Sequence, residues 1–183
     1  TAWKGFIQEF GADHFVVTWD YRGFFRSDRP EDRSTLAVGG HVRDLTLLLE
    51  HLDIGDAVFV SWSFGTQILL ESYRQIGHRF LAMVAVNGTY GVPFRRSPEV
   101  RGRSSLGVLR ALLPNENRVL KRAVRSLRDT PAVFDVAQRL RLVSPSINRE
   151  RFMQIAESFA ELNHVYYREM LRRFANHDAD DLL

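Results

Sequence analysis

The segment Ala57-Val58-Phe59-Val60-Ser61-Trp62-Ser63-Phe64-Gly65 decides the fold. Residues 57–61 are mostly apolar and rich in valine, which is the composition of a buried strand. Residues 66–76 follow with helical spacing and without an intervening loop. The sequence therefore predicts a strand, a sharp turn and a helix in direct succession.

Ser63 lies at the centre of this turn and is the candidate nucleophile. A strand that passes directly into a helix forces the middle residue into a strained backbone conformation, with its side chain projecting outward. Strand and helix approach closely there, so the residues two before and two after must be small, and Ser61 and Gly65 meet this condition. The backbone N–H of Phe64 would then face the oxyanion that forms when Ser63 attacks a carbonyl.

The rest of the first half alternates strands and helices. Two further apolar runs, Phe15–Trp19 and Leu81–Val86, predict strands. Between them, apolar residues recur every three or four positions from Val38 to Leu52, which predicts a helix with one buried stripe. Strand, helix, strand, helix and strand in this order predict an α/β fold with a doubly wound parallel sheet.

The second half has the pattern of helices. After Gly91 no β-rich run occurs, and five amphipathic segments fill most of residues 106–174. This change predicts two regions, a partial α/β core at residues 1–92 and a mostly helical cap region at residues 93–183.

Two helix boundaries can be predicted inside the cap region. Thr130 followed by Pro131 favours a helix that begins at the proline, because proline is tolerated at the first helical position. The apolar residues from Phe152 to Phe174 step by threes and fours, which predicts either two helices or one bent helix.

Two motifs resemble those of the α/β-hydrolase family, and the resemblance covers residues 3–90. Residues 16–28, VVTWDYRGFFRSD, are similar to the family's strand followed by D-x-R-G-x-G-x-S, with Phe25 in place of a glycine. Residues 61–65, SWSFG, are similar to G-x-S-x-G, with Ser61 in place of the first glycine. The hydroxyl of Ser61 needs a hydrogen-bond partner. Phe25 is strained if its backbone has the positive φ that a glycine at this position often adopts.

The resemblance implies a serine hydrolase of the esterase or lipase-like type that acts on an ester or other acyl substrate of modest size. Ser63 would be its nucleophile and the N–H of Phe64 one oxyanion donor, with no cofactor and no metal. A serine at this position argues against the epoxide hydrolases and haloalkane dehalogenases of the family, which use an aspartate. A cofactor-free perhydrolase is a further alternative.

The resemblance also implies a triad acid and histidine on late strands after the helical cap, and no such strand is recognisable. His177 looks like part of the linker that leaves the cap region, and Asn87 stands where some relatives place their acid. We therefore expect an internal fragment of a larger hydrolase, or the product of a broken reading frame, that also lacks the first strands and the second oxyanion donor. It would be inactive alone, because a serine without a base is a poor nucleophile, and it would have an exposed sheet edge and uncovered apolar strands.

Composition limits the remaining possibilities. The chain has 183 residues, 45% of them hydrophobic and 26% charged, which is typical of a globular domain. It has no cysteine, so disulfides, thiolate zinc sites and a thiol nucleophile are excluded, and this fits a reducing compartment such as the cytoplasm. The apolar run Leu81–Val86, like every other wholly apolar run of the chain, is too short to cross a membrane.

The charge of the segment Arg95–Arg128 suggests an alternative hypothesis for the function. It contains ten basic and two acidic residues, a net charge of +8. We interpret it as part of a cap over the mouth of the site with its arginines in solvent. Contact with a membrane surface is possible on this pattern but not favoured, and nucleic acid is disfavoured because no aromatic residues interleave the charges. The alternative is a non-catalytic α/β-hydrolase-like domain whose basic cap contacts an anionic partner.

Other polar residues are interpreted as structural. Asp20 and Arg22 are expected to hold their turn through hydrogen bonds rather than to act on a substrate. The histidines have no spacing typical of a metal site, and most are expected to be surface residues or helix caps. These are His14, His41, His51, His78 and His164.

Overall fold

The computed structural model describes residues 3–88, 90–91, 122, 124–126, 128–139 and 146–182. They belong to two compact units, which we describe separately. Unit 1 comprises Thr1–Asp20 and Pro114–His164, and unit 2 comprises Tyr21–Leu113 and Val165–Leu183. The predicted boundary between core and cap region, at residues 92 and 93, lies outside the described residues.

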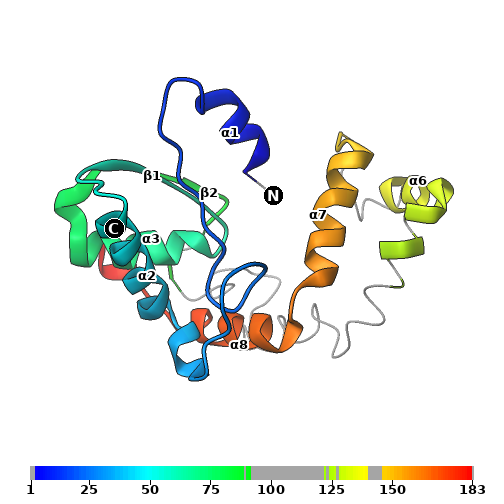
Figure 1. Ribbon diagram of the computed structural model, residues 1–183. Helices are drawn as coiled ribbons and strands as arrows, with labels where there is room; N and C mark the ends of the chain where they lie inside the picture. The colour runs from blue at the N-terminus through cyan, green and yellow to red at the C-terminus, as the bar shows by residue number, and fades with distance from the viewer. Residues whose placement is uncertain are drawn as a thin grey trace. The chain divides into compact units, whose positions relative to one another are not determined.

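Unit 2 contains a two-stranded parallel sheet and the helix that connects its strands (Figure 1). Strand β1 (Ala57–Trp62) pairs with β2 (Phe80–Val86), so that Trp62 lies beside Val86 at the carboxyl ends. Helix α3 (Gly65–Ile76) begins three residues after β1 and packs against both strands. The strands predicted at residues 57–61 and 81–86 and the helix predicted at residues 66–76 are thus confirmed.

Helix α2 (Val38–His51) packs against α3. Its apolar stripe is buried as predicted from Val38 through Val42 and Leu45 to Leu49, whereas Leu52, the last member of the predicted stripe, follows the helix and is 36% exposed. The helix ends where predicted, because Asp53 adopts a left-handed backbone with φ +52° and allows the N–H of Ile54 to return to the carbonyl of Leu49, at 2.9 Å.

The end of the chain completes the core of unit 2. Helix α8 (His164–Phe174) contributes Phe174, which is fully buried. Beyond the helix, the N–H of Ala179 donates to the carbonyl of Tyr90 at 2.9 Å, so the last residues lie next to the chain that leaves β2. Residues distant in sequence therefore pack around the sheet and its helices.

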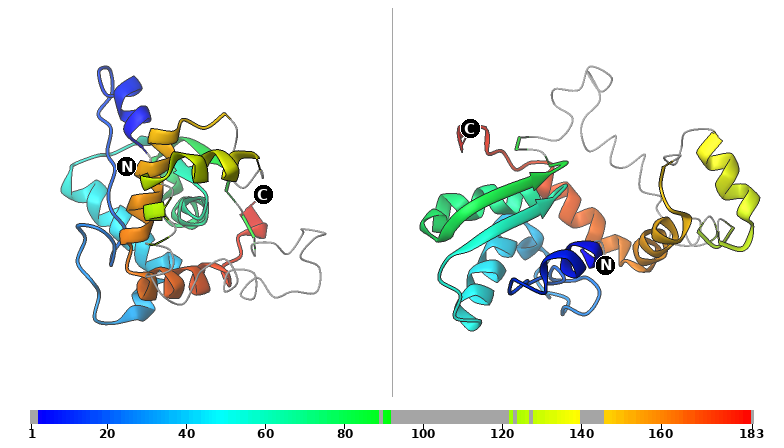
Figure 2. Two further views of the ribbon diagram at one scale, coloured as in Figure 1. Left: turned by 90° about the vertical axis from the view of Figure 1, so that its right-hand side faces the viewer. Right: turned by 90° about the horizontal axis from the view of Figure 1, so that it is seen from above.

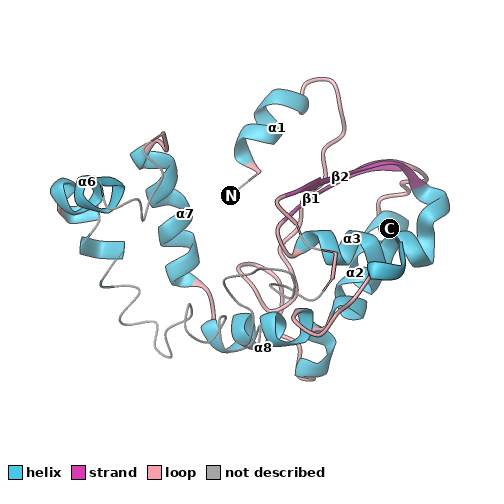
Figure 3. Ribbon diagram, turned by 180° about the vertical axis from the view of Figure 1, so that it is seen from behind, coloured by secondary structure: helices cyan, strands magenta, loops and turns pink. Residues whose placement is uncertain are grey.

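Unit 1 is helical in its described residues (Figure 3). It contains α1 (Lys4–Phe10), α6 (Pro131–Arg139) and α7 (Arg149–Glu161). Helix α6 begins at Pro131 as predicted, and the stretch from Phe152 to Phe174 forms two helices, α7 and α8. The segments predicted between residues 106 and 121 lie outside the described residues.

The predicted strand at Phe15–Trp19 is not present in the structure. These residues carry no strand assignment, and the Phe15 side chain is 78% exposed. A strand exists only when a neighbouring strand accepts its hydrogen bonds, and an apolar β-branched run does not specify that partner. The sheet of the described residues consequently has two strands rather than three.

Among the described residues, one face of β1 is covered, whereas β2 is exposed on both faces. In β1 the side chains of Phe59 and Ser61 are buried, whereas Val58 and Trp62 are 56% and 49% exposed. In β2 Leu81 is 69% exposed. Figure 2 shows β1 and β2 side by side with their carboxyl ends in the same direction. The uncovered apolar strands expected from the sequence are therefore present.

Candidate active site

Ser63 lies at the turn between β1 and α3 and has a left-handed backbone, with φ +55°. Its N–H donates to the carbonyl of Val86 at 2.9 Å, which extends the pairing of the two strands into the turn. Its own carbonyl accepts from the N–H of Thr66 at 3.1 Å. This conformation costs a non-glycine residue about 1–2 kcal/mol. The strained turn predicted from the sequence is therefore present at Ser63.

The residues on either side are small for steric reasons. A Cβ atom at Gly65 would lie 3.0 Å from the phenol oxygen of Tyr21 and 3.5 Å from the Cβ of Ser61. Ser61 is only 5% exposed, and its hydroxyl lies 3.1 Å from that of Thr66. The serine that replaces the usual glycine thus has the partner that its buried hydroxyl requires.

The turn presents an N–H donor beside the candidate nucleophile. Phe64 precedes the first residue of α3 and has helical backbone angles, and among the described residues its N–H has no hydrogen-bond partner. Unpaired N–H groups at a helix N-terminus, together with the helix dipole, favour an anion at that position. The Ser63 side chain is half-buried, and no histidine in the described ranges is hydrogen-bonded to its hydroxyl. Among the described residues, the turn therefore places a serine hydroxyl beside an N–H donor, and no histidine is hydrogen-bonded to that hydroxyl.

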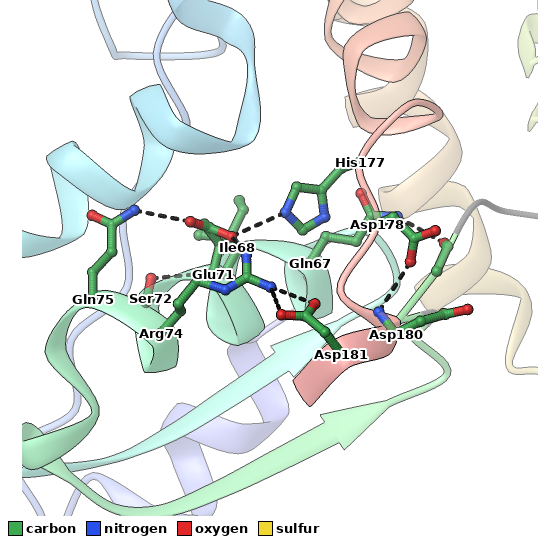
Figure 4. A network of polar contacts seen from close by, with 11 residues as sticks. Gln67, Ile68, Glu71, Ser72, Arg74, Gln75, His177, Asp178, Asp180 and Asp181 are labelled. Atoms are coloured by element: carbon green, nitrogen blue, oxygen red, sulfur yellow. Dashed lines mark hydrogen bonds and ion pairs between the residues drawn. The ribbon is translucent and has the colours of Figure 1, made fainter. Parts of the chain in front are cut away.

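His177 is held in a polar network on α3, shown in Figure 4. Its Nε2 lies 3.4 Å from a carboxylate oxygen of Glu71. Arg74 also pairs with Glu71 and donates to both carboxylate oxygens of Asp181, at 2.6 and 2.8 Å. These contacts fasten the last residues of the chain to the helix and do not include Ser63.

His41 is buried, contrary to the expectation for the histidines. Its ring lies 4.9 Å from that of Tyr21 and 5.4 Å from that of Phe174, and Phe174 in turn contacts Phe64 beside the turn. Burial lowers the pKa of His41 to about 4, so the ring is neutral near pH 7. The helical spacing could have predicted this burial, because His41 follows Val38 by one turn on the buried stripe.

The other histidines divide in the same way. His14, His51 and His78 are exposed, as predicted, and His51 is the last residue of α2. His164 is buried, because it begins α8 directly after α7 and its Nε2 lies 3.3 Å from the carbonyl of Phe159. In the part of the chain that the structure describes, no group of three potential metal ligands is assembled.

Arg22 makes a structural contact, as predicted, but this contact joins its loop to α2 rather than holding the turn itself. Its Nε and Nη2 atoms donate to the two carboxylate oxygens of Asp44 on α2, at 2.7 and 2.5 Å. The hydrogen bond and the charge of Asp44 raise the pKa of the guanidinium. In the same loop Phe25 has φ +46° and is 60% exposed, so the phenylalanine does occupy a backbone conformation suited to glycine. The role predicted for Asp20 stays a prediction.

Asn87 follows β2 directly and is exposed, with φ +48°. It is thus at the carboxyl end of the strand next to the one that carries Ser63. Most of the basic segment predicted at Arg95–Arg128 lies outside the described residues.

A pocket of about 280 Å³ lies elsewhere, in unit 1, and contains no candidate nucleophile. Two arginines and two glutamates line it, and Arg128 among them is already paired with Asp129 and Glu157. The lining residues are Val124, Arg125, Arg128, Glu157, Ala160 and Glu161. It is not the site at the turn.

The comparisons with known proteins identify the fold family of the chain. A family model described as "alpha/beta hydrolase fold" matches residues 2–181, and the chain belongs to this family. The resemblance seen in the sequence is thereby confirmed. No helix in the described ranges is long and apolar enough to cross a membrane.

Two solved structures share the fold. A hydrolase from Oleispira antarctica matches with a TM-score of 0.65 and 16% identity, over 99% of this chain and 63% of the other. An alpha/beta hydrolase enzyme from a Medee basin deep-sea metagenome library matches with a TM-score of 0.63 and 19% identity, over 100% of this chain and 62% of the other. The chain spans less than two thirds of the length of either protein.

Proposed function

We propose that the protein is a serine hydrolase that cleaves an ester or other acyl substrate of modest size. The observation that carries the proposal is the left-handed Ser63 between β1 and α3, beside a Phe64 N–H that has no partner among the described residues. Strain at a non-glycine residue is typical of functional sites. Here it places a hydroxyl at the carboxyl end of a strand, where α/β folds bind their ligands.

The proposed reaction passes through an acyl-enzyme. The Ser63 oxygen forms a bond to the substrate's carbonyl carbon while a base takes the hydroxyl proton, and the N–H of Phe64 donates to the resulting oxyanion. The bond from carbon to the alcohol then breaks, and the alcohol leaves with the proton. Water hydrolyses the acyl-enzyme in the reverse sense, which restores the serine. The reaction requires a histidine, oriented by an acid, as this base.

Labelling with a fluorophosphonate tests the proposal. The probe phosphonylates an activated serine and releases fluoride, so peptide mass spectrometry of the complete protein as its gene encodes it identifies the modified residue. We expect the modification on Ser63, none in a Ser63→Ala variant and none in heat-denatured wild-type protein. Equal labelling of wild type and Ser63→Ala contradicts the proposal. A folded wild type that is not labelled also contradicts it and favours the non-catalytic binding domain.

A further inference from the structure

The strained turn at Ser63 is bridged by two buried hydroxyls. Ser61 is on the inward face of β1 and Thr66 in the first turn of α3, and each is 5% exposed. Their oxygens are 3.1 Å apart, so the hydrogen bond joins the two chain segments that enter and leave the turn. A non-glycine residue keeps a left-handed backbone only where its surroundings fix it. The hydrogen bond between Ser61 and Thr66 joins the residues on either side of Ser63.

Thr66 also contacts the third segment of the site. A Cβ atom placed on Gly88 would lie 1.8 Å from the Thr66 hydroxyl oxygen, so the chain that leaves β2 passes directly against this side chain. The N–H of Thr66 donates to the carbonyl of Ser63 itself. Thr66 therefore joins the start of α3 to the end of β1 through its hydroxyl, and its side chain lies against the chain that leaves β2.

The Thr66 hydroxyl is not used to cap the helix. The residue that precedes α3 is Phe64, which has no side-chain capping hydrogen bond. Threonine is also an unfavourable residue inside a helix, because its branched side chain loses rotamer freedom. Its hydroxyl is engaged with Ser61 instead, which is the specific contact that a purely apolar residue of the same shape would lack.

We propose that Ser61 and Thr66 are positioning residues that hold the Ser63 backbone, and with it the hydroxyl and the N–H of Phe64, in the reactive arrangement. The part of this inference that concerns reactivity rests on the proposed function. The part that concerns the turn does not, because the hydroxyl pair would restrain the Ser63 backbone whether or not the serine reacts.

Three variants separate the hydroxyl from the shape of the side chain. Thr66→Val keeps the shape and removes the hydroxyl, Thr66→Ser keeps the hydroxyl, and Ser61→Ala removes its partner. We expect the second-order rate constant of fluorophosphonate labelling to fall about tenfold or more in the Val and Ala variants and to stay within about twofold of wild type in Thr66→Ser. In the double variant Ser61→Ala/Thr66→Val the loss should not exceed that of the slower single variant, because both substitutions remove the same interaction.

Amide hydrogen exchange gives a second readout that needs no reactivity. Without the bridge, exchange of the Ser63 N–H, which is bonded to Val86, should accelerate about tenfold, while exchange within α2 should be unchanged. Unchanged exchange at Ser63 overturns the inference, and so does a Thr66→Ser variant that labels as slowly as Thr66→Val. Accelerated exchange in a protein whose wild type is not labelled supports the bridge and contradicts only the proposed function.

Discussion

The burial of His41 makes the stability of the protein depend on pH in a way that one substitution removes. The folded protein lowers the pKa of this ring from 6.5 to about 4, chiefly by removing it from water. The nearby charges of Asp44 and Arg22 act in opposite directions, the first raising and the second lowering the pKa. The unfolded chain takes up a proton near pH 6.5, whereas the folded protein resists it until about pH 4.

The free energy follows from the difference between the two states. The difference between a pKa of 6.5 in the unfolded chain and one of about 4 in the folded protein corresponds to about 3 kcal/mol of stability. None of it is lost above pH 6.5, about 2 kcal/mol is lost at pH 5, and about 3 kcal/mol is lost at pH 4, because the unfolded state alone binds the proton. Against a typical total of about 5–15 kcal/mol, this is a large fraction.

Urea unfolding of the wild type and of His41→Phe at pH 7, 5 and 4 measures the effect. Phenylalanine keeps an aromatic ring between Tyr21 and Phe174 and has no proton to bind. The carboxylates of the protein titrate in both variants, so the difference between their free energies of unfolding isolates His41. We expect this difference to change by about 3 kcal/mol between pH 7 and pH 4 in favour of His41→Phe. Parallel curves would refute the assignment of a neutral buried ring.

Two further predictions concern the loop before α2. Phe25→Gly should raise the free energy of unfolding by about 1 kcal/mol, because glycine adopts a positive φ without strain. Phe25→Ala keeps the Cβ atom and should bring no gain, so an equal gain in both variants would attribute the effect to the exposed ring. Asp44→Asn removes the charged partner of Arg22 and should cost about 1–2 kcal/mol in urea unfolding. A cost that persists in an Arg22→Ala background would show that the ion pair is not its source.

Much of the fold was predictable because its signals are local. The valine-rich run at residues 57–61 and the stripe of α2 each depend on the spacing of neighbouring residues, and both elements form where predicted. The prediction of a strand at Phe15–Trp19 was wrong because strand pairing is not a local property. Its composition is that of a strand, but pairing requires a partner that no local pattern names.

In the candidate site, too, the features set by local sequence could be predicted and those set by tertiary packing could not. The turn at Ser63 could be predicted, because a strand that passes directly into a helix forces a sharp, strained turn between them. The hydroxyl contact between Ser61 and Thr66 could not, because their distance depends on how the helix is placed after the turn. The burial of His41 was missed although its spacing on α2 contained the signal, since a histidine is not counted among apolar residues.

The exposed apolar side chains of the two strands predict how the protein responds to salts and to urea. Val58, Trp62 and Leu81 are in contact with water over much of their surface. Sulfate and other strongly excluded salts increase the free energy of such contact, whereas low concentrations of urea decrease it. We therefore expect salting out to promote self-association of the protein through these strands. We expect low concentrations of urea to reverse this association while the helices remain folded.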